Sequence, residues 1–291
     1  MFGKISRLAL LSLITTLVVS LTACKKKDEP PPGKPTRVTV TKAYEKYFGP
    51  APTTDKGTCY AFVIYFPSAK ETGKVTPFPF FTFDEGTTKK VAMERLLGGM
   101  GVPAYKNEIL QPFAPGTHLL EFSESEGLVR VNLSRDFLLN GNYKKGMLNA
   151  LVMTLTQFEG VKGVRLLSEG KEIDFAQGAL LPDASAVLDP APPKLLSVTA
   201  VKDKGKEDVE EVSAYFDRPV EIKELTISDR SGKPFAGEVF HSVFDMAAVL
   251  KPKDPSLFKA GMPVKIRWKV IDKLARTAEG DGEFPLDLKE H

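Results

Sequence analysis

The stretch KKGMLNALVMTLTQFEGVKGVRLL, residues 144–167, decides the fold of the first half of the chain. Its apolar residues recur at intervals of three and four, which predicts a helix over about 144–158 with one buried face. That face consists of Met147, Leu151, Leu155 and Phe158, and it is widened by Leu148 and Val152. Gly160 ends the helix, and residues 164–167 predict a strand.

The residues upstream predict further elements around this helix. Residues 58–66 are dense in β-branched and aromatic residues and predict a strand that ends at Pro67. A loop rich in Pro and Phe is expected over 77–81, followed by a helix capped by Thr87 or Thr88. Residues 120–123 and 129–133 alternate around a Ser-Glu-Gly turn and predict a hairpin. Two helices interleaved with a small sheet indicate an α+β fold for residues 38–189.

Several motifs in this region occur in the order typical of a known family. They are APGT at 114–117, GLVRVNLS at 127–134, LVMTLTQFEG at 151–160, VKGVRLL at 161–167 and EGK at 169–171. Together they resemble the GerMN domain, whose members occur in lipoproteins of sporulation and spore germination and in other envelope lipoproteins. The resemblance implies an α+β scaffold without catalytic activity. The chain departs from the family pattern at Asn132, where an Asp is frequent.

The remaining residues, 190–291, follow a stiff Pro-Ala-Pro-Pro joint and lack helical periodicity. About seven short alternating runs separated by turns predict an all-β sandwich, with one Trp on the inner face of residues 264–270. The segment from Asp272 to Gly282 is expected to be a turn. The motifs FDRPV at 216–220 and DRSG at 229–232 resemble bacterial Ig-like domains, including the CopC type. The chain has three His residues, too few for the histidine ligands of a copper carrier of that type, and no metal or other cofactor is expected.

The N-terminus predicts export and lipidation. Lys4 and Arg7 precede the uncharged apolar run 8–23, which is too short and too rich in Ser and Thr for a membrane span. The run ends in Leu-Thr-Ala-Cys, so residues 1–23 resemble a lipoprotein signal peptide that is cleaved between Ala23 and Cys24. The resemblance implies acyl chains on Cys24, including palmitate, and such chains anchor a protein stably. Residues 24–37 are rich in Lys and Pro and predict an extended tether.

Composition limits the classes of partner. The whole chain carries a formal charge of +3, and removing residues 1–23 leaves +1, spread along the sequence, so nucleic-acid binding is not expected. Cys59 lies in a predicted strand and is expected to be a small buried residue. We therefore expect an extracytoplasmic protein held to a bacterial membrane through Cys24, on the periplasmic face if the cell has two membranes. Its partners would be other envelope proteins or further copies of itself.

Three functional hypotheses remain open from the residues. The first is a non-catalytic, GerMN-type scaffold or interaction module that would act in sporulation or germination. The second is a cell-wall-associated enzyme, for which His118 and His241 are the usable bases although neither lies in a nucleophile motif. The third is an envelope-anchored ligand binder that would use a possible interaction loop, whose aromatic residues could alternatively cap the core. The loop residues are Phe78, Phe80, Phe81 and Phe83.

Overall fold

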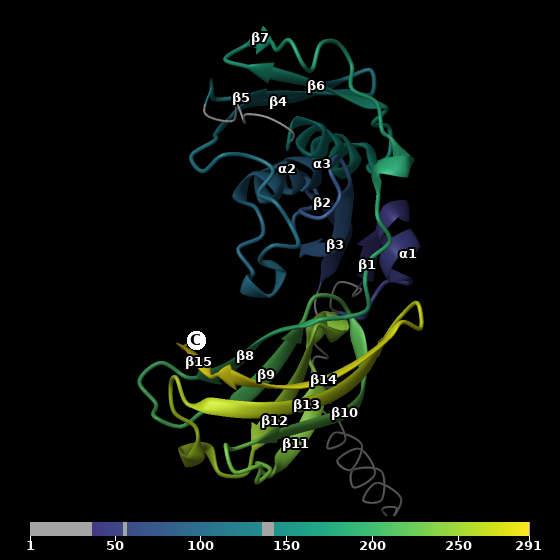
Figure 1. The fold of residues 1–291 in the computed structure, drawn as a ribbon. Helices are drawn as coiled ribbons and strands as arrows, with labels where there is room; N and C mark the ends of the chain where they lie inside the picture. The colour runs from purple at the N-terminus through teal and green to yellow at the C-terminus, as the bar shows by residue number, and fades with distance from the viewer. Residues whose placement is uncertain (1–36, 55–56, 136–142, 291) are drawn as a thin grey trace, which may run out of the picture. The chain divides into compact units, whose positions relative to one another are not determined.

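The computed structural model describes residues 37–54, 57–135 and 143–290, which lie in a compact unit spanning Pro35–His291 (Figure 1). The α+β region comprises β1 (Arg37–Val40), α1 (Lys42–Phe48), β2 (Thr58–Pro67), β3 (Val75–Thr82), α2 (Thr88–Gly98), η1 (Pro103–Tyr105), β4 (Leu119–Ser125), β5 (Leu128–Leu133), α3 (Lys144–Thr156), β6 (Gly163–Ser168), β7 (Lys171–Glu172) and η4 (Ala184–Ala186). The sandwich comprises β8 (Leu195–Lys202), β9 (Glu211–Phe216), β10 (Val220–Ser228), β11 (Gly237–His241), η5 (Val243–Asp245), β12 (Ala247–Pro252), η6 (Pro255–Leu257), β13 (Pro263–Asp272), β14 (Thr277–Pro285) and β15 (Asp287–Glu290).

Helix α3 is the centre of the α+β region, as its periodicity predicts. It packs between two sheets, one ordered β1-β2-β3 and the other β4-β5-β6-β7, and α2 lies beside it (Figure 1). Met147, Leu151 and Leu155 are almost completely buried in the shared core. The outer face of the first sheet is covered by α1, whose Tyr47 ring contacts that of Tyr65.

The Pro/Phe-rich segment forms a strand, β3, so the prediction of a loop over 77–81 was wrong. Pro77 pairs with Tyr65 and Pro79 with Val63 in an antiparallel ladder with β2. Proline is tolerated here because β3 is an edge strand, and residues at this two-residue spacing would point their N–H groups away from β2. The missing donors also leave the open edge poorly suited to pair with another strand.

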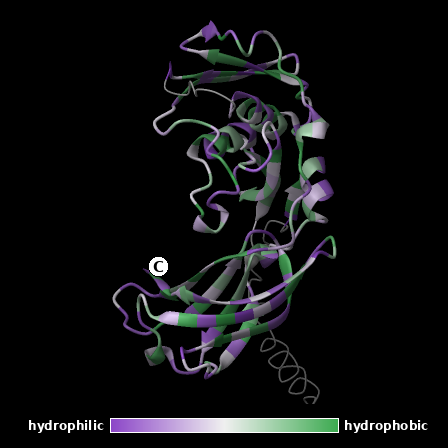
Figure 2. Ribbon diagram, viewed as in Figure 1, coloured by the Kyte–Doolittle hydropathy of each residue, from purple (hydrophilic) through white to green (hydrophobic). Residues whose placement is uncertain are grey.

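The C-terminal residues form two sheets, ordered β10-β13-β14 and β11-β12-β9-β8-β15, with a common apolar core. Hydropathy alternates along these strands, and β13 shows the pattern clearly (Figure 2). On β13, Val264, Ile266 and Val270 are buried, as the sequence predicts. The two-region assignment of fold class, α+β followed by an all-β sandwich, is therefore confirmed.

The turn expected between Asp272 and Gly282 is confined to residues 273–276, because β13 ends at Asp272 and β14 begins at Thr277. Gly280 lies directly opposite Trp268 on β13. A Cβ atom at Gly280 would lie 3.0 Å from the indole ring, so the glycine makes room for the ring. Glycine usually weakens a strand, whereas here its missing side chain leaves the space that the neighbouring tryptophan needs.

Candidate functional site: a groove beside helix α3

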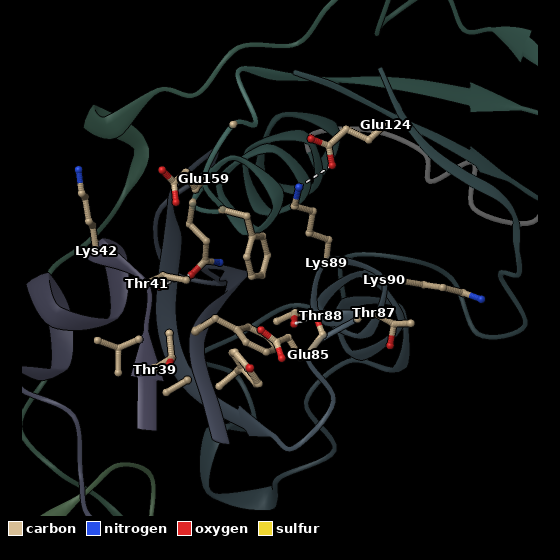
Figure 3. Close-up of a pocket in the computed structure, with 18 of the residues that line it drawn as sticks. Thr39, Thr41, Lys42, Glu85, Thr87, Thr88, Lys89, Lys90, Glu124 and Glu159 are labelled. Carbon is tan, nitrogen blue, oxygen red and sulfur yellow. Dashed lines mark hydrogen bonds and ion pairs between the residues drawn. The ribbon is translucent and has the colours of Figure 1, made fainter. Parts of the chain in front are cut away.

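An open groove of about 990 Å³ lies in the described part of the α+β region (Figure 3). It lies on the face of the first sheet that α2 and α3 cover, beyond the C-terminal end of α3. The residues that line it come from the β1–α1 junction, β2, the start of α2, β4 and the end of α3. They are Thr39–Lys42, Tyr60–Phe62, Glu85–Lys90, Phe122, Glu124 and Gln157–Gly160.

One wall of the groove exists because β1 is shorter than β2. Strand β1 pairs with β2 as far as Ala61, and Thr41 then caps helix α1 by accepting a hydrogen bond from the Tyr44 N–H. The next outward-facing peptide groups of β2 are therefore left without a strand partner. Because buried peptide groups need partners, side chains from elsewhere must supply them.

The amide side chain of Gln157 takes the place of the missing strand. Its Oε1 accepts hydrogen bonds from the Val63 N–H at 2.8 Å and from the Thr41 hydroxyl at 2.9 Å. Its Nε2 donates to the Val63 carbonyl at 2.5 Å and to the Thr154 carbonyl at 2.8 Å. A single side chain thus joins β1, β2 and α3 at the edge of the groove.

The threonines of the same helix have different roles. The hydroxyl of Thr154 accepts a hydrogen bond from the Tyr65 N–H at 3.1 Å, one step further along β2. The Thr156 hydroxyl donates to the Val152 carbonyl at 2.8 Å. The Thr156 hydroxyl thus bonds back to the preceding turn of the helix, while Thr154 supplies a partner to the sheet. Periodicity gives no sign of this role, because the partner strand lies about 90 residues earlier.

The opposite wall is the entrance to α2. Asp84 accepts hydrogen bonds from the backbone N–H of Thr87 at 3.2 Å and from its hydroxyl at 2.7 Å. Thr87 occupies the N-cap position, as predicted, but its side chain makes no capping bond to the helix. Lys89 pairs with Glu124 of β4 at 2.5 Å and ties the helix start to the second sheet (Figure 3).

The charges in the groove balance one another. The Glu85 carboxylate accepts a hydrogen bond from the Tyr60 hydroxyl, and this bond is the main cause that raises the pKa of Tyr60. Lys89 is neutralised by Glu124. The lining therefore offers hydroxyl groups, an aromatic floor and paired charges, which suits the binding of a polar surface of low net charge better than the capture of an anion or cation.

The four phenylalanines of the possible interaction loop do not form one patch. Phe78 and Phe80 lie on the face of β3 that meets the core, and Phe78 is 4% exposed. Phe81 points to the opposite face, where its ring contacts Tyr44 and Phe244. Phe83 alone is largely exposed, at 60%. The proposed loop is thus corrected to a strand that contributes to the core, with only its last aromatic residue at the surface.

The remaining predicted residues lie apart. Ala23, Cys24 and the predicted signal peptide are outside the described residues. His118 lies in the α+β region and His241 on β11 of the sandwich, and the Ser134 hydroxyl accepts a hydrogen bond from the backbone N–H of His118. Cys59 is buried, as predicted. Among the described residues, no group of three or more His, Cys, Asp or Glu side chains could hold a metal ion.

The structure also explains the departure at Asn132. This side chain is 9% exposed, and its Oδ1 accepts a hydrogen bond from the Gly170 N–H at 2.8 Å. The contact holds the turn between β6 and β7 against β5. Only an acceptor oxygen is required, and an aspartate supplies one as well. The difference between Asn and Asp at this position therefore leaves the local structure intact.

Comparisons with known proteins agree with the motifs. Residues 63–174 match the family model described as "Germane: Sporulation and spore germination". A comparison with curated proteins yields no match.

In the described part of the chain, no helix has both the length and the apolar character needed to cross a bilayer.

Solved structures give low-level similarities. The first GerMN domain of the sporulation protein GerM from Bacillus subtilis is 18% identical, covers 43% of this chain and 94% of its own, with a TM-score of 0.33. CopC from Methylosinus trichosporium OB3b is also 18% identical, covers 33% and 89%, and has a TM-score of 0.23. A putative lipoprotein from Clostridium perfringens is 20% identical, covers 40% and 79%, and has a TM-score of 0.28. By its match to the family model, the segment 63–174 is a GerMN-type domain.

Proposed function

We propose that this protein is a non-catalytic, lipid-anchored envelope protein that docks partner proteins through its GerMN-type domain. The family description favours a process of sporulation or spore germination. The lipobox Leu-Thr-Ala-Cys24 supports anchoring by acyl chains at an extracytoplasmic membrane surface. The Lys/Pro-rich residues that follow would hold the folded region away from that surface.

The groove is the observation that carries the docking role. Its lining comes from five separate segments, and the Gln157 network joins three of them, namely the β1–α1 junction, β2 and the end of α3. Preformed, rigid walls lose little conformational entropy on binding, which favours association. Because the groove lining carries as many Glu as Lys residues, the proposed partner presents a polar protein surface of low net charge.

Metabolic labelling tests the anchor. Cells are fed a fatty acid with a clickable group, and the wild-type protein is compared with the Cys24→Ser variant. We expect the wild type to carry the label and to partition into the detergent phase, and the variant to lose both properties. A labelled variant, or an unlabelled wild type, would contradict the proposal.

Site-specific photocrosslinking tests the groove in the full-length protein. A photoreactive amino acid is placed at Thr87 or Glu159, which are exposed at the rim, and at Glu283 on the sandwich as the matched exposed control. We expect adducts with a discrete envelope protein from the two groove positions and none from Glu283. Adducts from Glu283 alone would place the docking surface elsewhere.

A further inference from the structure

A cluster of buried charged side chains lies where the sandwich contacts the α+β region. Asp217 and Arg218, directly after β9, are only 5% and 3% exposed. Arg218 donates to both oxygens of Asp217, with Nε at 3.0 Å from Oδ1 and Nη2 at 2.8 Å from Oδ2. Its Nη1 lies 3.8 Å from Asp272, which is also buried. Buried charges are strongly unfavourable unless they are paired, so the stability of this cluster depends on its partners.

Residues of the α+β region supply further partners, although Nη1 of Arg218 makes no hydrogen bond to any described residue. The hydroxyl of Tyr105, at the end of η1, donates to Oδ2 of Asp217. Arg276 donates to Oδ2 of Asp272 at 2.6 Å and, through Nη2, to the backbone carbonyl of Tyr47 at 2.7 Å. The Arg218 guanidinium also lies 5.6 Å from the centre of the Phe48 ring. The charged residues belong to the sandwich, whereas several of their partners belong to the α+β region.

A lysine forms a second polar link across the same junction. Lys194, just before β8, donates to the Glu108 carboxylate at 2.7 Å and to the Ala104 carbonyl at 3.0 Å. Its ammonium also lies 4.6 Å from the centre of the Tyr105 ring. The same tyrosine is therefore contacted at its ring and at its hydroxyl.

An aromatic contact joins the two regions at a different point. The rings of Phe81 on β3 and Phe244 in η5 are stacked, with centroids 4.7 Å apart and planes 3° from parallel. Phe244 and the next residue, Asp245, have φ values of 64° and 55°. Bulky residues rarely adopt this left-handed conformation, and it persists only where surrounding contacts stabilise it. Here the stack and the 2.9 Å ion pair between Asp245 and Lys273 supply those contacts.

We propose that the GerMN-type domain and the sandwich form one rigid unit, locked by the Tyr105–Asp217–Arg218 cluster and by the Phe81–Phe244 stack. Separating the two regions would leave Asp217 without the Tyr105 hydroxyl and would remove the contact that stabilises the strained turn. Domains joined by small polar surfaces usually move relative to each other, but directional bonds to buried charges favour one arrangement. The groove of the GerMN-type domain therefore keeps one orientation relative to the sandwich, and the Pro-rich joint between the two regions does not act as a hinge.

Pulsed electron paramagnetic resonance on the full-length protein in detergent micelles tests the lock. Spin labels are attached at Lys171→Cys on β7 and Glu279→Cys on β14, both exposed positions. Cys59 is fully buried and should not react, and a sample without the introduced cysteines measures any background. We expect a single narrow distribution of distances. A broad distribution in this otherwise unchanged protein would overturn the proposal whatever the variants do.

Two substitutions then weaken the lock selectively. Tyr105→Phe removes only the hydroxyl, and Phe244→Gly removes the ring while suiting the left-handed backbone. We expect the double variant to broaden the distance distribution and to divide a single calorimetric transition into two. The matched control, Tyr60→Phe, loses a hydroxyl that bonds within the GerMN-type domain and should keep the narrow distribution. A double variant that keeps both the narrow distribution and the single transition would contradict the proposal.

Discussion

Gln157 offers the sharpest test of how the GerMN-type domain is held together. Replacing it with Met keeps the volume of the side chain but removes every hydrogen bond that the amide makes. The N–H and carbonyl of Val63 and the hydroxyl of Thr41 would then lose a partner. Val63 is 0% exposed, whereas Gln157 lines the groove, so water can approach the vacated positions from the groove side.

The size of the effect follows from these contacts. Leaving a buried donor or acceptor unpaired costs about 1–3 kcal/mol, and two backbone groups are affected. Because the network is partly buried and water in the groove can replace part of it, we expect Gln157→Met to lower the free energy of unfolding by about 2–4 kcal/mol. The change should appear as a lower urea midpoint with an unchanged slope.

Gln111→Met is the matched control. This amide is exposed and makes one 3.3 Å bond to the Leu97 carbonyl, so its loss should cost less than about 0.5 kcal/mol. Gln157→Glu adds a pH-dependent comparison, because a carboxyl group can donate to the Val63 carbonyl only when it is protonated. Its folded-state pKa should be raised, so this variant should lose stability as pH rises. Equal urea midpoints for Gln157→Met and Gln111→Met would refute the reasoning.

Three further predictions concern other parts of the fold. Asn132→Asp should stay within about 1 kcal/mol of the wild type, whereas Asn132→Leu should cost about 1–3 kcal/mol, because only the acceptor to Gly170 matters; thermal unfolding of both checks this. Gly280→Val should cost about 1–3 kcal/mol and shift the fluorescence of Trp268, while Gly101→Val, at an open position, should change neither. Stability should fall as pH rises above about 10, because burial raises the pKa of three tyrosines and the unfolded chain ionises first. Absorbance at 295 nm combined with urea unfolding should show this loss, and Tyr105→Phe should reduce its slope; stability that stays constant up to pH 11 would argue against it. The three tyrosines whose pKa is raised by burial are Tyr44, Tyr65 and Tyr105.

The sequence by itself determined the elements whose signals are local. Helix α3 and strands β2, β5 and β13 follow from the spacing of apolar residues, because one buried face imposes a period of 3.6 or 2 on each. The order and identity of the motifs indicated the resemblance to GerMN domains, which the family match confirms over residues 63–174. The lipid anchor remains a prediction of the N-terminal sequence.

Tertiary structure alone decided what depends on residues distant in the chain. Prolines in β3 and glycines in β14 looked like loop residues, yet an edge position and a facing indole make them suitable for strands. In the sequence, Gln157 is an ordinary polar residue at the end of a helix. Only the structure shows that the short strand β1 leaves Val63 without a strand partner on that side, which Gln157 replaces. Phe81 appeared available for an external partner, but it stacks on Phe244. Periodicity reports which face of an element is buried, and it carries no information about what lies across from that face.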